Sequence, residues 1–248
     1  MLGFSLKDCK ITSLGVESLA GALQTNRSLT HLSLAGLSIS CSATALAEAI
    51  RLNQTLTHLD LSCSGIGDLG TEAICKALQS NHVMTNLELG GNTIGDSGAE
   101  ALAGALQLPA TQLSYLGFSH CLITSKGVKA LAGALRTNRS LTDLELISIY
   151  IEPREMLAEA LAEALAEALQ SNRTLTNLNL SLNQISDTGA IQLAQTLRNK
   201  NNTLAYLNLR LNRIGAEGQA KLELVDQKRC VISLEAQLRD WRYDSILE

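Results

Sequence analysis

Two histidines and one aspartate are the residues of this 248-residue chain whose types and spacing best fit metal chemistry. His31 and His58 fall at the same position of two successive sequence repeats, and Asp60 follows His58 by two residues. On adjacent strands the two imidazoles would lie about 5 Å apart, and with a carboxylate nearby they could hold zinc. The sequence offers no fourth ligand and the surface is open. We therefore expect solvated histidines, with no metal and no other cofactor.

A thiol nucleophile is the second chemistry that the residue types allow. Cys63 would need a histidine within hydrogen-bonding distance to act as one. His58 precedes it on the same predicted strand and would lie roughly 16 Å away at the rise of a strand. His120 belongs to a unit two repeats further on. We therefore expect no catalytic site and no enzymatic activity.

The elements that position these residues come from a repeat of about 28 residues with the pattern L-x-x-L-x-L-x-x-N-x-I. A fixed period in this range is typical of a solenoid, in which each unit buries its apolar face by stacking on its neighbours. The eight copies begin at Met1, Leu29, Leu56, Met84, Leu113, Leu141, Leu175 and Leu204.

Each unit predicts a short strand, a turn, a helix and a second turn. The Asn at the ninth position, as in Asn92, Asn183 and Asn212, is expected to hydrogen-bond the backbone of the turn. Helix N-caps are expected at Ser13, Asp68, Asp96, Ser125 and Asp187. An Asn in the left-handed conformation is expected to end the helix at Asn26, Asn53, Asn81, Asn138 and Asn172.

Stacking of such units predicts a curved molecule. Strands stack about 4.8 Å apart, whereas helices approach no closer than about 8–10 Å. The predicted fold class is therefore an α/β solenoid shaped like a horseshoe, with parallel strands on the concave face and helices on the convex face. We expect the solenoid over residues 1–229 and a C-terminal cap over 230–248, in which Cys230–Leu234 adds a closing strand and Trp241 is an anchor.

The L-x-x-L-x-L-x-x-N/C-x-I core and the G-x-x-A-L-A-x-A-L helix resemble the ribonuclease-inhibitor class of leucine-rich repeats. The stretch GDSGAEALAGAL, Gly95–Leu106, is closest in wording to the repeats of NOD-like receptors. The resemblance covers residues 1 to about 229 and implies a leucine-rich-repeat solenoid that binds protein through its concave strands and loops, without a cofactor. The repeats do not alternate strictly between two types, so no inhibitor contact residue is carried over.

Composition narrows the classes of partner and compartment. The formal net charge is −4, there are one Trp, four Tyr and two Phe, and no dense run of Lys or Arg occurs, so we expect no nucleic-acid partner. No apolar stretch reaches the roughly 18–20 residues of a membrane span, and the start MLGFSLKDCK lacks the apolar core of a signal peptide. The six cysteines form no CxxC pair and have no matching spacings, which predicts reduced thiols and a cytoplasmic location, or the host cytosol for a secreted effector.

A candidate partner site lies on the concave face of repeats five to eight. Aromatic and aliphatic anchors in polar surroundings suit a protein interface. The alternative is that a large concave surface carries some apolar residues by chance. The candidate residues are Tyr115, Asp143, Glu145, Ile147, Leu182, Tyr206 and Leu211.

Two irregularities interrupt the pattern. In MLAEALAEALAEALQ the motif LAEA occurs three times and predicts a helix lengthened by a slipped duplication; the alternative is a protruding acidic contact made by Glu159, Glu163 and Glu167. The first repeat begins at Met1 without a polar cap. Two explanations are open: the chain is a segment of a longer protein, or it covers this edge by self-association.

The leading functional hypothesis is a non-enzymatic module that binds another protein, either the ligand-sensing end of a receptor or a bacterial effector. The rival is a regulator that activates a small GTPase, as the Ran activator does, but the long acidic C-terminal tail associated with that family is absent here. A GTPase assay separates the two. A scaffold built from consensus repeats is a weaker third reading, because repeats six and eight are irregular.

Overall fold

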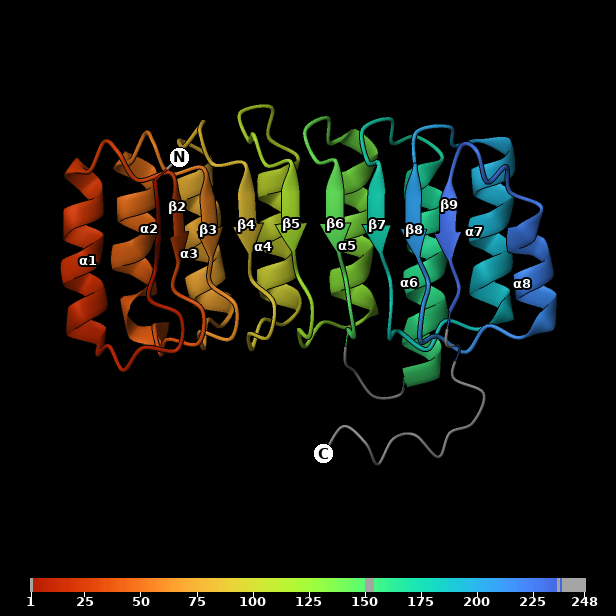
Figure 1. Ribbon diagram of the computed structural model, residues 1–248, viewed down its shortest axis with the longest axis horizontal. Coiled ribbons are helices and arrows are strands. Elements are labelled where there is room, and N and C mark those ends of the chain that lie inside the picture. Colours follow the sequence, from red (N-terminus) through yellow and green to blue (C-terminus); the bar gives the residue numbers. More distant parts are fainter. Residues whose placement is uncertain (1, 150–153, 236, 238–248) are drawn as a thin grey trace.

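The computed structural model describes residues 2–149, 154–235 and 237, and it places a row of helices behind a single sheet (Figure 1). The chain passes along the row from one end to the other, one strand and one helix at a time. The strands are β1 Gly3–Ser5, β2 His31–Ser33, β3 His58–Asp60, β4 Asn86–Glu88, β5 Tyr115–Gly117, β6 Asp143–Glu145, β7 Asn177–Asn179, β8 Tyr206–Asn208 and β9 Val231–Ser233. The helices are α1 Ser13–Thr25, the short 3-10 turn η1 Ser40–Ser42, α2 Ala43–Leu52, α3 Asp68–Leu78, α4 Asp96–Leu106, α5 Ser125–Thr137, α6 Arg154–Leu169, α7 Asp187–Asn199 and α8 Ala216–Glu223.

The sheet is parallel and its strands follow the order of the chain, from β1 to β9. The register pairs equivalent positions of successive repeats, for example Gly3 with His31 and His31 with His58. This confirms the repeat starts that the sequence predicts. β9 lies within the expected closing strand and pairs with β8. Trp241 lies outside the described residues, and the division of the chain at residue 229 stays a prediction.

The core lies between the sheet and the helices and consists mainly of leucine. The middle residue of each strand from β2 to β8 points into it and is buried: Leu32, Leu59, Leu87, Leu116, Leu144, Leu178 and Leu207. Phe4 holds the same position on β1 but remains 47% exposed, because no described strand lies on the outer side of β1. Self-association through this edge stays a prediction.

The ninth-position asparagines are buried and connect neighbouring repeats, as expected. Asn92 donates through Nδ2 to the carbonyl oxygens of Leu61 and Leu89, both at 2.8 Å. Its Oδ1 accepts the N–H groups of Ser64 and Ile66, both at 3.0 Å. Backbone groups that would otherwise be buried and unpaired are thereby satisfied. Asn183 and Asn212 make equivalent bonds.

The asparagines after the helices are not left-handed, and this prediction was wrong. Asn53 has φ −77° and ψ 133°, an extended conformation. Its buried side chain donates to the carbonyl of Leu23 at 2.7 Å and accepts the N–H of Leu56 at 2.7 Å. The Asn is therefore required for its amide, which pairs backbone groups of two repeats, and not for its backbone freedom. The buried members of this second ladder are Asn53, Asn81, Asn138, Asn172 and Asn201.

The predicted N-caps are each displaced by one residue. Asp68, Asp96 and Asp187 are the first residues of their helices, and each carboxylate accepts bonds from the next repeat. Asp96 Oδ1, for example, accepts the N–H groups of Thr124 at 2.7 Å and Gly127 at 2.9 Å. Each Asp thus satisfies free N–H groups at the start of the following helix, where a negative charge is also favoured. The residues at the N-cap position itself are Thr12, Gly67, Gly95, Thr124 and Ser186, in place of the predicted Ser13, Asp68, Asp96, Ser125 and Asp187.

Helix α6 is the longest of the described helices, and its three glutamates do not form one exposed stripe. Glu159 is half-buried and accepts the hydroxyl of Ser186 at 2.5 Å and its N–H at 3.2 Å, so it takes the place of the bridging Asp. Glu163 is exposed, and Glu167 pairs with Arg136 at 3.1 Å.

Candidate protein-binding surface

The concave face consists of the first and third residues of each strand, which are the third and fifth residues of each repeat. Their side chains point away from the core while the middle residue points into it, because side chains alternate along a strand. Parallel register aligns equivalent positions into rows that cross the sheet. One row is Gly3, His31, His58, Asn86, Tyr115, Asp143, Asn177, Tyr206, and the other is Ser5, Ser33, Asp60, Glu88, Gly117, Glu145, Asn179, Asn208.

Four of the candidate binding residues lie on the strands of this face. Tyr115, Asp143 and Tyr206 share the first row, and Glu145 lies in the second. Tyr115 and Asp143 are direct neighbours on β5 and β6. Tyr206 is 38% exposed and is separated from Asp143 by Asn177, whose amide donates to the Asp143 carboxylate.

The other three candidates lie in the turns that follow the strands. Ile147 is half-buried and its N–H donates to the hydroxyl of Ser119 at 3.1 Å. Leu182 and Leu211 have φ of 62° and 56°. Positive φ is uncommon for leucine, but the eighth position of every repeat has it here: Asp8, Gly36, Cys63, Gly91, His120, Ser148, Leu182 and Leu211. The seven candidates therefore occupy two zones, a strand face and a row of turns, and not one cluster.

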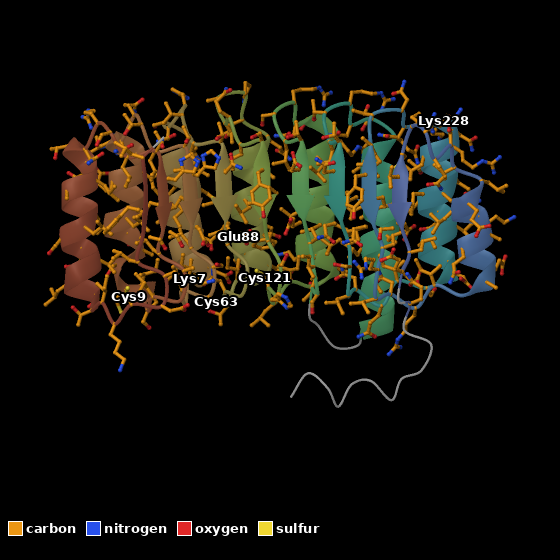
Figure 2. All side chains as sticks on the ribbon, viewed as in Figure 1. Lys7, Cys9, Cys63, Glu88, Cys121 and Lys228 are labelled. Carbon is orange, nitrogen blue, oxygen red and sulfur yellow. The ribbon has the colours of Figure 1, made fainter. Side chains whose placement is uncertain are left out.

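A phenol and two carboxylates, those of Tyr115, Glu88 and Glu145, lie together on this face. Glu88, which is labelled in Figure 2, is not among the candidate residues that the sequence indicated. The Tyr115 hydroxyl donates to Glu88 Oε2 at 2.7 Å, and Glu88 Oε1 accepts the N–H of Gly90 at 2.8 Å. The Glu88 carboxylate occupies the space where Gly117 lacks a side chain. The signal that could have revealed this was a glycine between two glutamates in one row.

This arrangement shifts the titration of two of the groups. Burial, together with the hydrogen bond to Glu88, raises the pKa of Tyr115. Burial also raises the pKa of the Glu145 carboxyl, the neighbouring Glu88 and Asp143 raise it further, and Tyr115 opposes them. Two carboxylates are therefore held close together, with a hydroxyl as the hydrogen-bond donor and no lysine or arginine between them on this face.

His31 and His58 are neighbours, as the sequence predicts, but they form a stacked pair. Their ring centroids are 3.8 Å apart and the planes differ by 16°. The hydroxyl oxygen of Thr30 lies 2.9 Å from His31 Nδ1, and that of Thr57 lies 2.8 Å from His58 Nδ1. Asp60 accepts the hydroxyl of Ser33 at 2.8 Å. Within the part of the chain that the structure describes, no group of three or more potential ligands could hold a metal ion.

A hollow of about 480 Å³ lies over β1 to β5, at the other half of the face from the one the sequence favoured. The outward-facing polar and aromatic residues of its lining are Ser5, His31, Ser33, His58, Asp60, Asn86, Glu88 and Tyr115. Over most of the face the charged side chains are acidic. Among the third, fifth and seventh residues of the repeats, all of which the structure describes, no Lys or Arg occurs between Lys7 and Arg210.

All six cysteines are free, but they differ in exposure. Cys75, Cys121 and Cys230 are buried, and burial raises the pKa of the first two thiols to about 12 and of the third to about 11. Cys9, Cys41 and Cys63 are exposed. Cys9 and Cys63 lie at the ends of the strands (Figure 2).

The chain is similar to known proteins in sequence. A family model described as "Leucine Rich repeat" matches residues 52–75, 80–103, 171–194 and 200–222. The chain is similar to human "NACHT, LRR and PYD domains-containing protein 5", with 30% identity over 196 residues, which is 79% of this chain and 14% of that protein. The chain therefore spans about a seventh of the length of this relative.

Among solved structures, the chain resembles "Leiomodin-1 Actin-Binding Site 2 (ABS2)" with a TM-score of 0.41 and 18% identity, covering 68% of this chain and 80% of the other. In the part of the chain that the structure describes, no helix is both long and apolar enough to cross a membrane.

Proposed function

We propose, from the premise that this chain is a solenoid of leucine-rich repeats, that it is a non-enzymatic module that binds a protein partner on its concave face. Such repeats indicate a protein–protein interaction module. The parallel sheet fixes the spacing of the side chains in each row, so a partner meets a surface that is already ordered and less conformational entropy is lost on binding. The name of the human relative joins LRR to NACHT and PYD domains, which supports the ligand-sensing part of a receptor as the context.

The charge of the face is the observation that carries the proposal. Four carboxylates lie on three strands of the face: Asp60 on β3, Glu88 on β4, and Asp143 and Glu145 on β6. In the three rows that face the partner, the described Lys and Arg residues occur only at the two ends, as Lys7 and Arg210. Complementary charge steers association and selects partners. The partner surface is therefore basic or rich in amides.

The apolar anchors are Tyr115 and Tyr206 on the strands and Ile147 in the turn after β6. Aromatic residues dominate the binding energy of protein interfaces because they bury a large area with few rotatable bonds. Asp143 and Glu145 lie beside these anchors and orient the partner. Leu182 and Leu211 extend the same surface along the turns.

The compartment we propose is the cytosol. All six cysteines are free although three of them are exposed. Exposed thiols persist where glutathione and thioredoxin keep them reduced.

Two substitutions in the concave face test the proposal on a partner captured with the full chain. Tyr206→Ala should weaken binding by about 1–3 kcal/mol, the usual range for an aromatic anchor. Asp143→Lys should slow association and reduce its dependence on salt, because it reverses a charge that steers the partner. Equilibrium and kinetic binding measurements at two salt concentrations give both results.

The matched control is Glu163→Lys on the convex side. Glu163 is exposed, whereas Glu159 and Glu167 bond to residues of neighbouring repeats. Its binding should equal that of the parent chain. Full affinity through both concave substitutions, with loss on Glu163→Lys, would place the partner on the convex face and refute the proposal.

A further inference from the structure

The stacked histidines present unused hydrogen-bond acceptors to the hollow over β1 to β5. Thr30 Oγ1 donates to the carbonyl of Leu2 at 3.1 Å, and Thr57 Oγ1 donates to the carbonyl of Thr30 at 3.0 Å. A hydroxyl has one hydrogen, so each Thr that donates to a carbonyl must accept from the Nδ1–H of the neighbouring histidine. The neutral rings then carry their lone pairs on Nε2, and no described group bonds to either Nε2.

Stacking favours this neutral state. Two imidazolium rings at a centroid separation of 3.8 Å repel each other, so both cannot be protonated without a cost. Burial lowers the pKa of His58, and His31 lowers it further. The stack therefore disfavours protonation of both rings at once, and His58 in particular is kept as an uncharged acceptor.

The charged groups around the hollow are also acceptors, and the uncharged polar side chains beside them are Ser5, Ser33 and Asn86. Asp60 from β3 and Glu88 from β4 contribute carboxylates, and the Tyr115 hydroxyl from β5 already donates to Glu88. The β1 residues in the lining are Gly3, Phe4 and Ser5, which carry no charge. The titratable groups that face the histidines are thus Asp60, Glu88 and Tyr115, and none of them is a cation.

We infer that the hollow over β1 to β5 binds an arginine side chain of the protein partner, and that the uncharged His31–His58 stack allows this cation to bind. A guanidinium has five N–H donors, no acceptor and a flat face that stacks on aromatic rings. It therefore complements the two Nε2 acceptors, the carboxylates of Asp60 and Glu88 and the flat faces of the histidine rings. This inference rests on the proposed binding function and adds to it a side-chain specificity and a dependence on pH.

Acidification should lower the affinity of the hollow for the arginine side chain. Protonation turns each Nε2 into a donor and adds positive charge beside the guanidinium, whereas carboxylates in general stay ionised until a lower pH. Repulsion between surface charges a few ångströms apart changes an equilibrium by roughly fivefold to tenfold. Binding should fall by about this factor between pH 7.5 and pH 5.5.

The experiment uses the full chain and a peptide of defined sequence, acetyl-Gly-Gly-Arg-Gly-Gly-amide. The control peptide has citrulline in place of arginine, which keeps the shape and removes the charge. Histidine ring resonances are followed by NMR during titration with each peptide at pH 7.5 and 5.5. His82 and His120 are exposed and lie outside the hollow, so they are internal controls.

The expected result is a saturable shift of His31 and His58 with the arginine peptide at pH 7.5, absent with citrulline and absent at His82 and His120. The affinity should fall by roughly fivefold to tenfold at pH 5.5. In the double variant His31→Gln with His58→Gln, the shift of the arginine peptide's own signals should lose this pH dependence, because glutamine is an uncharged acceptor at both pH values. Asp60→Asn should weaken binding at both pH values and keep their ratio.

Three outcomes would overturn the inference: no saturable shift at His31 and His58, equal binding of the citrulline peptide, or an affinity that does not change between the two pH values. Each leaves the proposed function intact if Tyr206→Ala still weakens the captured partner. If neither Tyr206→Ala nor Asp143→Lys affects that partner, the concave binding function fails, whatever the arginine peptide does.

Discussion

Leu87 is the residue at which the packing of the stacked core can be measured. It is 1% exposed and lies on β4 between Leu59 and Leu116 of the adjacent strands. Leu87→Ala should cost about 2–5 kcal/mol in free energy of unfolding, because the strands on both sides prevent the core from closing around the cavity. Denaturant unfolding gives the value.

Leu69→Ala is the matched control for that substitution, since Leu69 is 81% exposed on α3. Its free energy of unfolding should stay within about 0.5 kcal/mol of that of the parent chain. Equal effects of the two substitutions would show that the assigned register is wrong.

Glu145 is a residue whose charge opposes folding. Its folded-state pKa is raised, chiefly by burial and then by Glu88. A carboxyl with a raised folded pKa contributes stability that is present below its unfolded pKa and lost as the pH rises through the folded value. Glu145→Gln should therefore raise the melting temperature at pH 7 and have little effect near pH 3.

Thermal unfolding of Glu145→Gln at the two pH values, beside Glu163→Gln on the exposed side of α6, checks this sign. The control should shift little at either pH. A lower melting temperature for Glu145→Gln at pH 7 would mean that Tyr115 stabilises the carboxylate more than burial destabilises it.

At this scale the sequence identified which residues face outward but not how they pair. The neighbours His31–His58 and Tyr115–Asp143 follow from the period alone, because parallel register aligns equivalent positions. The contact between Glu88 and Tyr115 does not, because it depends on a side chain leaning across Gly117. Rotamers of that kind are set by space that only the folded neighbours define.

Helix α4 contains two glycines, one in open space and one in close contact with its neighbours, and substituting them tests how tightly the helix packs. A Cβ at Gly104 would meet nothing within 4 Å, so nothing in the structure requires glycine there. Gly104→Ala should stabilise the protein by about 0.5–1 kcal/mol, since glycine loses more conformational freedom in a helix than alanine. Gly98→Ala should destabilise it, because its Cβ would meet the side chain of Ile94 and, at 2.8 Å, the carboxylate of Asp68.

Chemical unfolding of the two variants gives the comparison within one helix. Stabilisation by both would contradict the role of Gly98, whose N–H donates to Asp68 at 3.0 Å. Destabilisation by both would mean that Gly104 has a contact that the structure does not show.

The order of the elements could be predicted from the sequence, but the bonds between them could not. Each strand, turn and helix follows from apolar periodicity and turn residues within one unit. Asp96 and Asn53 were assigned local capping roles, whereas both bond to a neighbouring repeat. The distance between units in space decides those bonds, and one unit's sequence does not contain it.

The state of the six thiols is a property of the whole molecule. Alkylation of the native protein without reductant should label Cys9, Cys41 and Cys63 first, because these are exposed. Cys75, Cys121 and Cys230 should react only after denaturation, since they are buried and their pKa values are raised. Mass spectrometry follows the labels. A native disulfide would overturn the assignment to a reducing compartment.

The strict order of the sheet, from β1 to β9 with helices that contact the helices next to them along the chain, has a mechanical consequence. The described contacts between elements join each repeat to the repeats before and after it, and the two asparagine ladders and the bridging aspartates reinforce these junctions. Tension applied at the two ends would therefore act on one junction at a time. Each repeat that came loose would release about 28 residues, or roughly 90–100 Å of extended chain, while the remaining repeats kept their shape. Such a molecule would lengthen stepwise under load, with the largest step at the long sixth repeat.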